Sequence, residues 1–493
     1  MRLVHRESEC DHAAMGCLAK CAQLGLALTV GLVATLGSFD DAAANGRFPA
    51  TTNIRFDPGN DQQILLPTTF GLLISSDGGG TFHWVCEDTI GYGGTYDPDY
   101  AVADNGDIYA TTFEGLRVSH DGACTFEDTE FYNDLTGGNG DPILLKNVWI
   151  GEIEVASDGK IWATTSTGGE PNDIYVSADG QRFDSANNLH PVAWWKSLRV
   201  SQSDPNTVYV SAFLIGTDGA DPTALLFKTT DGGANWTDLG VDSFTFGNQP
   251  NLFVEGISAT NPDIVYARVL GVRNPQGDDI YRSTDGGASW TKVVELSGVI
   301  SGFTVLANET VIAGTTTPCI EDLTGPLADG GLPNKGCVLI SPSGEEGTWT
   351  TPTQEPKLGC IGERSSDNSL YACGGNFAPD NFALGTSQDN GQTWTPVIRF
   401  DDIIGPLECA NDTVQYTCAE DVWPGQCTTL GICEAGDAGV SGGDGGNIGP
   451  DAGDDGGGDD DSCLGCQQGN KGGLPFFFTA LAVYFLGFRR RRA

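Results

Sequence analysis

The segment Ser75-Ser76-Asp77-Gly78-Gly79-Gly80-Thr81-Phe82 contains the pattern that decides the fold, because variants of it recur along the chain. The pattern is a hydroxyl residue, any residue, Asp, any residue, Gly, any residue, Thr or Ser, and an aromatic residue. It returns at 283–290 and 387–394, and with one change each at 119–126 and 229–236. An Asp side chain can accept hydrogen bonds from backbone amides two or three residues further on, and glycine supplies positive φ. Each copy therefore predicts a tight turn that is held by its Asp.

Two further copies of the pattern are degraded. The segment 177–183 is one residue short, and 341–344 has lost its Asp. The copies lie about fifty residues apart, which suits four short strands with their turns, the size of one propeller blade. The side chains predicted to hold these turns are Asp77, Asp121, Asp179, Asp231, Asp285 and Asp389.

The stretches around each copy have the composition of short strands. A β-rich run precedes the turn, as in 71–74, 173–176 and 279–282, and turn dipeptides such as Asp158-Gly159 separate it from another strand. The sequence therefore predicts an all-β fold, a single β-propeller over residues 45–400. Seven copies of the pattern favour seven blades.

Residues 401–433 bear on the number of blades. Asn411-Asp412 lies where the inner turn of an eighth blade would fall, and cysteines are frequent in this segment. We expect a cysteine-rich segment that closes a seven-bladed ring. A partial extra blade, which would make eight, is the alternative.

Over residues 46–410 the chain resembles Asp-box (BNR-repeat) propellers, a group that spans sialidases, xyloglucanase-type hydrolases, sortilin ectodomains and photosystem II assembly factors. The resemblance rests on the recurrent Asp–Gly turns and implies the propeller fold. Because these relatives share the turns and little else, the resemblance does not imply one activity.

The N-terminal end carries an export signal. Residues 1–44 combine basic residues, a short apolar run and small residues at 42–44, which is typical of a secretory signal peptide. Met15 is an alternative start to Met1, because it leaves a signal of more ordinary length.

The C-terminal end predicts a surface anchor. Residues 434–462 are nearly all Gly, Asp and small residues, a composition typical of a disordered linker. Cys463 and Cys466 follow, then an apolar run at 474–488 that is predicted to be a transmembrane helix. A basic cluster ends the chain: Arg489, Arg490, Arg491 and Arg492. This order resembles a myxobacteria-type C-terminal sorting signal, which implies anchoring at the bacterial cell surface or outer envelope.

The charge balance excludes one class of partner. The chain has 25 Lys and Arg against 66 Asp and Glu, a formal net charge of −41, whereas nucleic acid requires a basic face. Only His83, His120 and His190 lie in the exported part, which argues against zinc. We expect a monomer without a cofactor, with loose calcium binding by the acidic linker as the single exception.

Ten of the 15 cysteines lie in the exported body, and an even number in an oxidising compartment predicts disulfides. Such bonds would clip long loops and join neighbouring strands. Repeat geometry and loop position suggest the pairs Cys86–Cys124, Cys319–Cys337, Cys360–Cys373, Cys409–Cys418 and Cys427–Cys433.

A sialidase-like activity would need three arginines around the substrate carboxylate. Arg55, Arg268 and Arg364 lie near strands that could face the pore and are the candidates, but the neighbours of Arg55 do not match the motif of sialidases. A xyloglucanase-type mechanism places two catalytic Asp between two propellers, and this chain has the length for one. A sialidase-like glycoside hydrolase is therefore the catalytic alternative.

Binding is the function that the sequence favours. Trp194-Trp195, close to His190 and Lys196, would present aromatic faces to a sugar or peptide if exposed, and would form inter-blade core if buried. We expect a non-catalytic, surface-anchored propeller that binds a protein or glycan partner. An assembly factor for an envelope complex is the second alternative.

Overall fold

The computed structural model describes residues 47–94, 96–133, 142–168, 171–187, 189–215, 223–241, 252–270, 277–296, 298–316 and 338–433. The chain divides into Met1–Gly439 and Val440–Ala493, and all described residues belong to the first unit. The predicted signal peptide, linker, sorting cysteines, transmembrane helix and arginine cluster lie outside the described residues. Cys319 and Cys337 lie outside them as well.

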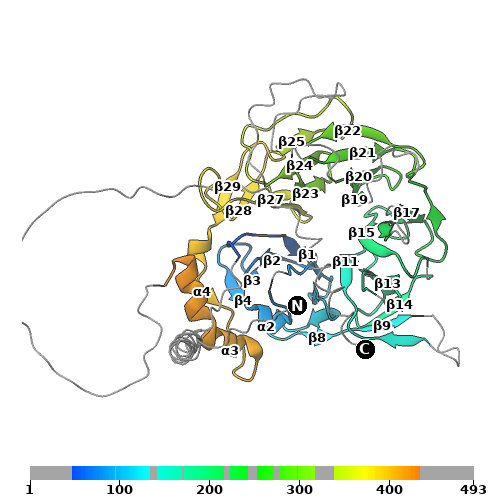
Figure 1. The fold of residues 1–493 in the computed structure, drawn as a ribbon. Helices are drawn as coiled ribbons and strands as arrows, with labels where there is room; N and C mark the ends of the chain where they lie inside the picture. Colours follow the sequence, from blue (N-terminus) through cyan, green and yellow to red (C-terminus); the bar gives the residue numbers. More distant parts are fainter. Residues whose placement is uncertain are drawn as a thin grey trace, which may run out of the picture. The chain divides into compact units, whose positions relative to one another are not determined.

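The described residues form seven β-sheets arranged in a ring, like the blades of a propeller (Figure 1). This confirms the all-β prediction and the seven blades, so the eight-bladed alternative is wrong. The strands of blades 1 to 3 are β1 (Arg55–Asp57), β2 (Asn60–Thr68), β3 (Gly71–Ser75) and β4 (His83–Val85); β5 (Tyr100–Val102), β6 (Ile108–Thr111), β7 (Leu116–Ser119) and β8 (Glu127–Asp128); and β9 (Glu130–Asn133), β10 (Ile143–Leu145), β11 (Ile150–Val155), β12 (Ile161–Thr165), β13 (Ile174–Ser177) and β14 (Arg182–Ser185). The strands of blades 4 to 7 are β15 (Trp194–Val200), β16 (Val208–Leu214), β17 (Thr223–Thr229) and β18 (Thr237–Asp238); β19 (Leu252–Ile257), β20 (Val265–Val269), β21 (Asp279–Ser283) and β22 (Thr291–Glu295); β23 (Ile300–Val305), β24 (Val311–Thr315) and β25 (Val338–Ser341); and β26 (Cys360–Arg364), β27 (Ser369–Cys373), β28 (Leu384–Ser387) and β29 (Thr395–Ile398).

Each blade is built from strands that follow one another in the sequence. The innermost strands are β1, β5, β11, β15, β19, β23 and β26, which lie side by side around the axis, and the later strands pair outward in antiparallel order. The hairpin β9–β10 widens blade 3, because β9 pairs in parallel with the outer strand β14. In blade 6 a single bridge between Ile340 and Thr350 stands at the place of a fourth strand.

Apolar burial between neighbouring blades holds the ring together. Trp162 of blade 3 packs edge-to-face on Trp236 of blade 4, with 6.4 Å between the ring centroids. Phe56 of blade 1 and Tyr371 of blade 7 pack with centroids 5.1 Å apart, so the same type of contact joins the last blade to the first. Aromatic rings of this size bury much apolar area each, and this burial is the main stabilising contribution between blades.

The recurrent Asp side chains hold turns, as the sequence predicts. Asp77 accepts hydrogen bonds from the amide of Thr81 (2.9 Å), the hydroxyl of Thr81 (2.8 Å) and the hydroxyl of Ser75 (2.9 Å). These bonds lower the pKa of Asp77 to about 2, and the bond from the Thr81 amide has the largest effect. The amide lies four residues after the Asp and not two or three, because two of the three glycines between them, Gly78 and Gly79, adopt positive φ and lengthen the turn. Asp121, Asp285 and Asp389 accept the same three bonds, and at Asp231 the side-chain amide of Asn235 takes the place of the threonine or serine hydroxyl.

The two degraded copies still form turns, by other means. Asp179 accepts hydrogen bonds from the amides of Gln181 and Arg182, two and three residues further on, because this turn is one residue shorter. Where the Asp is lost, the hydroxyl of Ser341 accepts a 2.7 Å hydrogen bond from the amide of Gly344 and contacts the hydroxyl of Thr348. The hydroxyl of the pattern therefore contributes to the turn even without the carboxylate.

After β29 the chain returns to blade 1 and closes the ring. The 3-10 helix η1 (Phe400–Asp402) leads into β30 (Gly405–Pro406), which pairs in parallel with the outer strand β4. Helices α3 (Val414–Asp421) and α4 (Trp423–Leu430) follow, and α3 contacts α2 (Glu87–Ile90), the short helix after β4. We call residues 400–433 the clasp, because they extend blade 1 and do not form a blade of their own.

Four disulfides join described residues, and two of them hold the clasp. The bonds Cys360–Cys373 and Cys427–Cys433 confirm predicted pairs. The predicted pairs Cys86–Cys124 and Cys409–Cys418 are wrong: the structure has Cys86–Cys418 and Cys124–Cys409. The physical reason is the return of the chain, which brings one clasp cysteine to blade 1 and another to blade 2. Disulfides of this kind are typical of exported proteins.

The antiparallel order gives the ring two different faces. The inner strands begin at one face, which also carries the loops between the second and third strands of each blade. We call this the channel face. The Asp turns join third and fourth strands and therefore lie at the opposite face, together with the hairpins between first and second strands.

Candidate functional site

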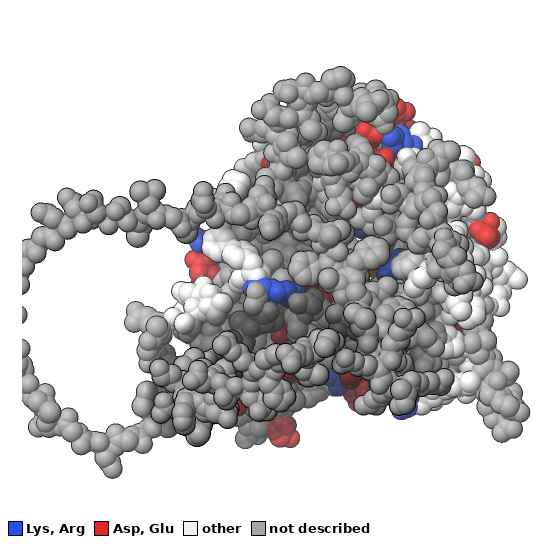
Figure 2. Space-filling model, in the orientation of Figure 1, with Lys and Arg blue, Asp and Glu red and all other residues white. Residues whose placement is uncertain are grey.

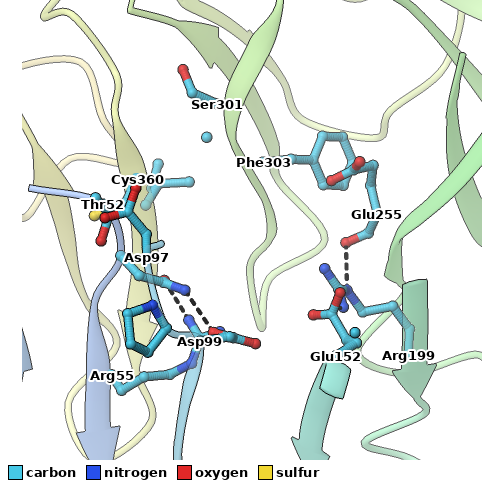
Figure 3. A pocket seen from close by; sticks show the side chains of 15 residues that line it. Thr52, Arg55, Asp97, Asp99, Glu152, Arg199, Glu255, Ser301, Phe303 and Cys360 are labelled. Atoms are coloured by element: carbon cyan, nitrogen blue, oxygen red, sulfur yellow. Dashed lines mark hydrogen bonds and ion pairs between the residues drawn. The ribbon is translucent and has the colours of Figure 1, made fainter. Parts of the chain in front are cut away.

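A pocket of about 310 Å³ lies among the inner strands at the centre of the ring. Figure 3 shows Arg55 and Asp99 on one side of it and Glu152, Arg199 and Glu255 on the other. Figure 2 shows basic and acidic side chains in the hollow at the middle of the ring. The lining is therefore charged, with signs that are mixed and an excess of carboxylates.

A repeated irregularity of the inner strands aims residues at this pocket. In β11, β19 and β23 the pairing register shifts by one residue at Gly151, Glu255 and Ser301, and all three residues line the pocket. Such β-bulges leave one residue unpaired and re-aim its side chain. In β15 the same shift occurs at Lys196. The backbone thus presents one unpaired position from each of four successive blades.

Arg55 is held at the pocket by an ion pair. Its Nη2 lies 2.7 Å from Oδ1 of Asp99, and its Nε donates a 2.7 Å hydrogen bond to the carbonyl of Tyr100. Arg55 belongs to β1 and Asp99 precedes β5, so this pair spans blades 1 and 2. The guanidinium is already neutralised by a protein carboxylate.

A second ion pair joins blades 3, 4 and 5. Arg199 Nη1 lies 2.8 Å from Oε1 of Glu152, and Arg199 Nε donates a 3.1 Å hydrogen bond to the carbonyl of Glu255. Burial raises the pKa of Glu152 to about 7, against the opposing effect of Arg199, and burial likewise raises the pKa of Glu154 to about 7. The pocket can therefore carry a proton on a carboxyl group at neutral pH.

The three arginines proposed for a substrate carboxylate do not meet. Arg55 lines the pocket, and Arg268 stands one strand further out, where its Nε lies 2.6 Å from Oε1 of Glu255. Arg364 ends β26 at the opposite face and pairs with Asp367 at 2.6 Å. Each arginine is paired with an acid, so they do not form a shared anion site.

A row of aromatic side chains crosses blades 2, 3 and 4 at the channel face. Neighbouring ring centroids lie 4.3, 5.0, 6.4 and 6.0 Å apart along the row. We call this row the aromatic band; in order it consists of Tyr96, Phe113, Trp149, Trp194 and Phe213. Two of its members adjoin the pocket in sequence, since Tyr96 precedes the lining residue Asp97 and Trp149 lies two residues before Gly151. At these two points the band therefore lies close to the pocket lining along the chain.

The three predicted binding residues separate into different roles. Trp194 belongs to the aromatic band and is partly exposed. Trp195 is fully buried between blades 3 and 4, so it is a core residue and not a binding residue. His190 lies in the loop before β15, where its backbone carbonyl accepts a hydrogen bond from the amide of Ala193. Strand alternation explains the split, because adjacent residues of a strand point to opposite sides.

Exposed apolar side chains gather on the channel face. Six of the large hydrophobic residues with high exposure lie on its loops, from 39% for Val299 to 70% for Phe48. Exposed apolar side chains that are concentrated on one face favour an interaction site there. The six are Phe48, Phe113, Val192, Ile215, Val299 and Phe377. The Asp turns give the opposite face a polar character instead.

No group of three or more His, Cys, Asp or Glu side chains in the described ranges has an arrangement that could hold a metal ion. Among the same residues, no helix has the length and apolar character needed to cross a membrane.

No protein-family model matches the chain. A stretch of 98 residues is 30% identical to xyloglucanase Xgh74A of Acetivibrio thermocellus, which covers 20% of this chain and only 11% of that enzyme.

Solved structures with similar folds share little sequence with the chain. One is the extracellular domain of a protein described as a one-component system of B. thetaiotaomicron, with TM-score 0.47, 13% identity, and coverage of 71% of this chain and 42% of that one. A second is YCF48 from Cyanidioschyzon merolae, with TM-score 0.42, 12% identity, and coverage of 66% of this chain and 92% of that one. A third is the GH74 xyloglucanase from Xanthomonas campestris, with TM-score 0.34, 13% identity, and coverage of 72% of this chain and 58% of that one. With TM-scores below 0.5 and identities of 12% to 13%, these likenesses say nothing about the activity of this chain.

Sequence reasoning missed most of the pocket lining. Glu152, Arg199 and Glu255 carry charge within otherwise apolar inner strands, and this pattern was the available signal. Trp149 and Phe213 gave no signal, because only the assembled ring places them beside Trp194.

Proposed function

We propose that this protein is an exported, non-catalytic propeller that binds a protein partner on its channel face. The observation that supports this is the concentration of exposed apolar and aromatic side chains on that face, beside a charged pocket. Interfaces combine aromatic anchors with a polar surrounding in the same way. We further propose that the C-terminal segment anchors the propeller at the cell surface, which the order of linker, cysteines, apolar run and arginines supports.

The proposal is tested by charge substitutions on the two faces. Phe113→Asp and Val192→Asp place a carboxylate on the channel face, and Ile404→Asp is the matched control, since Ile404 is 58% exposed and contacts Phe82 near the opposite face. Peptides selected from a displayed library against the exported chain should bind the wild type and the control. They should lose at least tenfold in affinity for the two channel-face variants. Selected peptides that bind all four proteins equally would contradict the proposal, and selective binding on a glycan array would replace the protein partner by a sugar.

A glycoside hydrolase is the second candidate, and one observation favours it. Glu152 lines the pocket with a pKa raised to about 7, the property of a carboxyl group that can donate a proton near neutral pH. Hydrolysis of fluorogenic glycosides by the wild type, abolished in Glu152→Gln, would establish this function over binding alone. Absence of turnover across sialosides and β-glucosides would exclude it for those substrates.

A further inference from the structure

Lys196 is a cation of the channel face whose ammonium group lies against aromatic rings. Its Nζ lies 4.9 Å from the ring centroid of Phe213, 5.9 Å from that of Trp194 and 6.0 Å from that of Trp149. No carboxylate of the described residues lies within ion-pair distance of it, in contrast to Arg55 and Arg199. Three aromatic rings therefore surround an ammonium group that has no acid beside it.

The backbone places Lys196 at a position equivalent to that of three pocket-lining residues, although Lys196 itself does not line the pocket. Lys196 occupies the bulge of β15, the position that Gly151, Glu255 and Ser301 occupy in neighbouring blades, and those three line the pocket. A bulge needs an unpaired residue but no particular side chain. The lysine is thus not required by the fold.

Desolvation makes the unpaired ammonium unfavourable. Burial lowers the pKa of Lys196 to about 8, and no neighbouring charge contributes to the shift. Aromatic faces attract a cation but replace only part of its hydration. A carboxylate brought by a ligand would supply the missing counter-charge, and the partly dehydrated surroundings would strengthen that ion pair.

The surroundings also limit what carries this carboxylate. Val192 is 67% exposed and Ile215 is 42% exposed, and they flank the strands β15 and β16 that carry Trp194 and Phe213. A chain with a formal net charge of −41 repels polyanions, so an acidic polysaccharide with many carboxylates is disfavoured. A single carboxylate next to apolar groups fits best, and a polypeptide offers this combination at its C-terminus.

We propose that Lys196 binds the C-terminal carboxylate of a polypeptide whose last side chains are apolar and lie on Trp149, Trp194 and Phe213. This inference rests on the proposed function, since it names the part of the protein partner that docks on the channel face. Charge-assisted pairing fixes the end of the peptide, and the rings provide the apolar contact.

The test compares peptides that differ only at the carboxylate. Fluorescence polarisation measures the binding of hexapeptides ending in Phe, Leu, Val or Ile, each prepared as the free acid and as the C-terminal amide. We expect the best free acid to bind at least tenfold more tightly than its amide. In Lys196→Met the acid should fall to the level of the amide, while Lys196→Arg should keep most of the preference. Lys160→Met is the matched control, because Lys160 is paired with Asp158 at the opposite face.

A spectroscopic measurement separates a direct role of Lys196 from a general loss of structure. NMR of the protein with ¹³C-dimethylated lysines should show a Lys196 pKa that rises when the free-acid peptide binds and does not rise with the amide. Thermal unfolding of Lys196→Met, within a few degrees of the wild type, confirms that the variant is folded.

Each outcome bears on one claim. Acid and amide peptides that bind equally, and equally in Lys196→Met, overturn the carboxylate site and leave binding on the channel face intact. If oligogalacturonate binds in a Lys196-dependent way and the peptides do not, the ligand is not a polypeptide C-terminus. If no peptide binds in a way that Phe113→Asp weakens, the proposed function itself is contradicted.

Discussion

Removing the two disulfides of the clasp should open the propeller, and the loss in stability can be worked out from their positions. Cys86–Cys418 and Cys124–Cys409 span 332 and 285 residues. In the chain-entropy account, a bond that closes a loop of about 300 residues stabilises the folded state by about 6 kcal/mol at 25 °C. The two bonds are not independent, however, because each closes almost the same loop.

The redundancy sets the result for single removals. With one bond intact, the other closes only the remaining loop, which runs through residues 86–124 and 409–418 and contains about fifty residues. Closing a loop of that length stabilises by about 4 kcal/mol. Removing either pair by Cys→Ala substitution should therefore cost about 4 kcal/mol, and removing both should cost about 10 kcal/mol. The second figure approaches the total stability of many domains.

Urea unfolding followed by tryptophan fluorescence measures these differences. The control is Cys427→Ala with Cys433→Ala, because that bond spans 6 residues within the clasp and should cost only about 2 kcal/mol. Non-covalent contacts of the clasp, such as the 2.8 Å hydrogen bond from Gln415 to the carbonyl of Trp84, remain in every variant. They hold the clasp only as long as it is already docked.

Three results would contradict this account of loop closure. If the variant without both long bonds unfolds within about 2 kcal/mol of the wild type, the bonds do not restrict the denatured chain as calculated. If the local control costs as much as either long bond, loop length is not the cause. Losses that simply add for the two long bonds, at about 6 kcal/mol each, would show that they do not share a loop.

Two further predictions concern the Asp turns and the pocket. Asp285→Ala removes three hydrogen bonds to the carboxylate and should lower the free energy of unfolding by about 2 kcal/mol. Asp61→Ala, at an exposed position, is the control and should change the free energy of unfolding little. Urea unfolding of both variants measures the two losses, and equal losses would contradict the prediction. The raised pKa of Glu152 and Glu154 means that the folded state binds protons more tightly than the unfolded one between pH 4.5 and about 7. Stability should therefore fall as the pH rises through this window, and Glu152→Gln with Glu154→Gln should flatten the profile in thermal unfolding; an unchanged slope would contradict the assignment.

The fold was predictable because its signal is local and repeated. Each Asp turn is complete within seven residues, as in Ser75–Thr81, so its sequence pattern needs no information from elsewhere in the chain. The spacing of the turns then implied the blade. Cys360–Cys373 was predictable for the same reason, since the two residues face each other in one hairpin.

The long-range pairings were not predictable from the same signal. Cys86 and Cys124 meet the clasp, and the path of the clasp depends on β30 joining the outer edge of blade 1. The three candidate arginines likewise all lie on strands of the ring: Arg55, Arg268 and Arg364. They differ in the end of the strand that they occupy and in whether that strand is the first or the second of its blade. Only the strand register decides which arginine reaches the pocket. Sequence spacing gives no access to either.

Positions where the fold dictates the residue type and positions where it does not lie on opposite faces of the ring. This difference supports a binding function on the channel face. At the opposite face the turn chemistry dictates residue types, because the hydroxyl, the Asp and the glycines each satisfy a backbone requirement. At the channel face four inner strands carry a bulge, and the bulged residue differs among them: Gly151, Lys196, Glu255 and Ser301. A position whose backbone is fixed and whose side chain is free can acquire a binding role without loss of the fold. An unpaired lysine surrounded by aromatic rings at such a position is therefore better explained by a ligand than by stability.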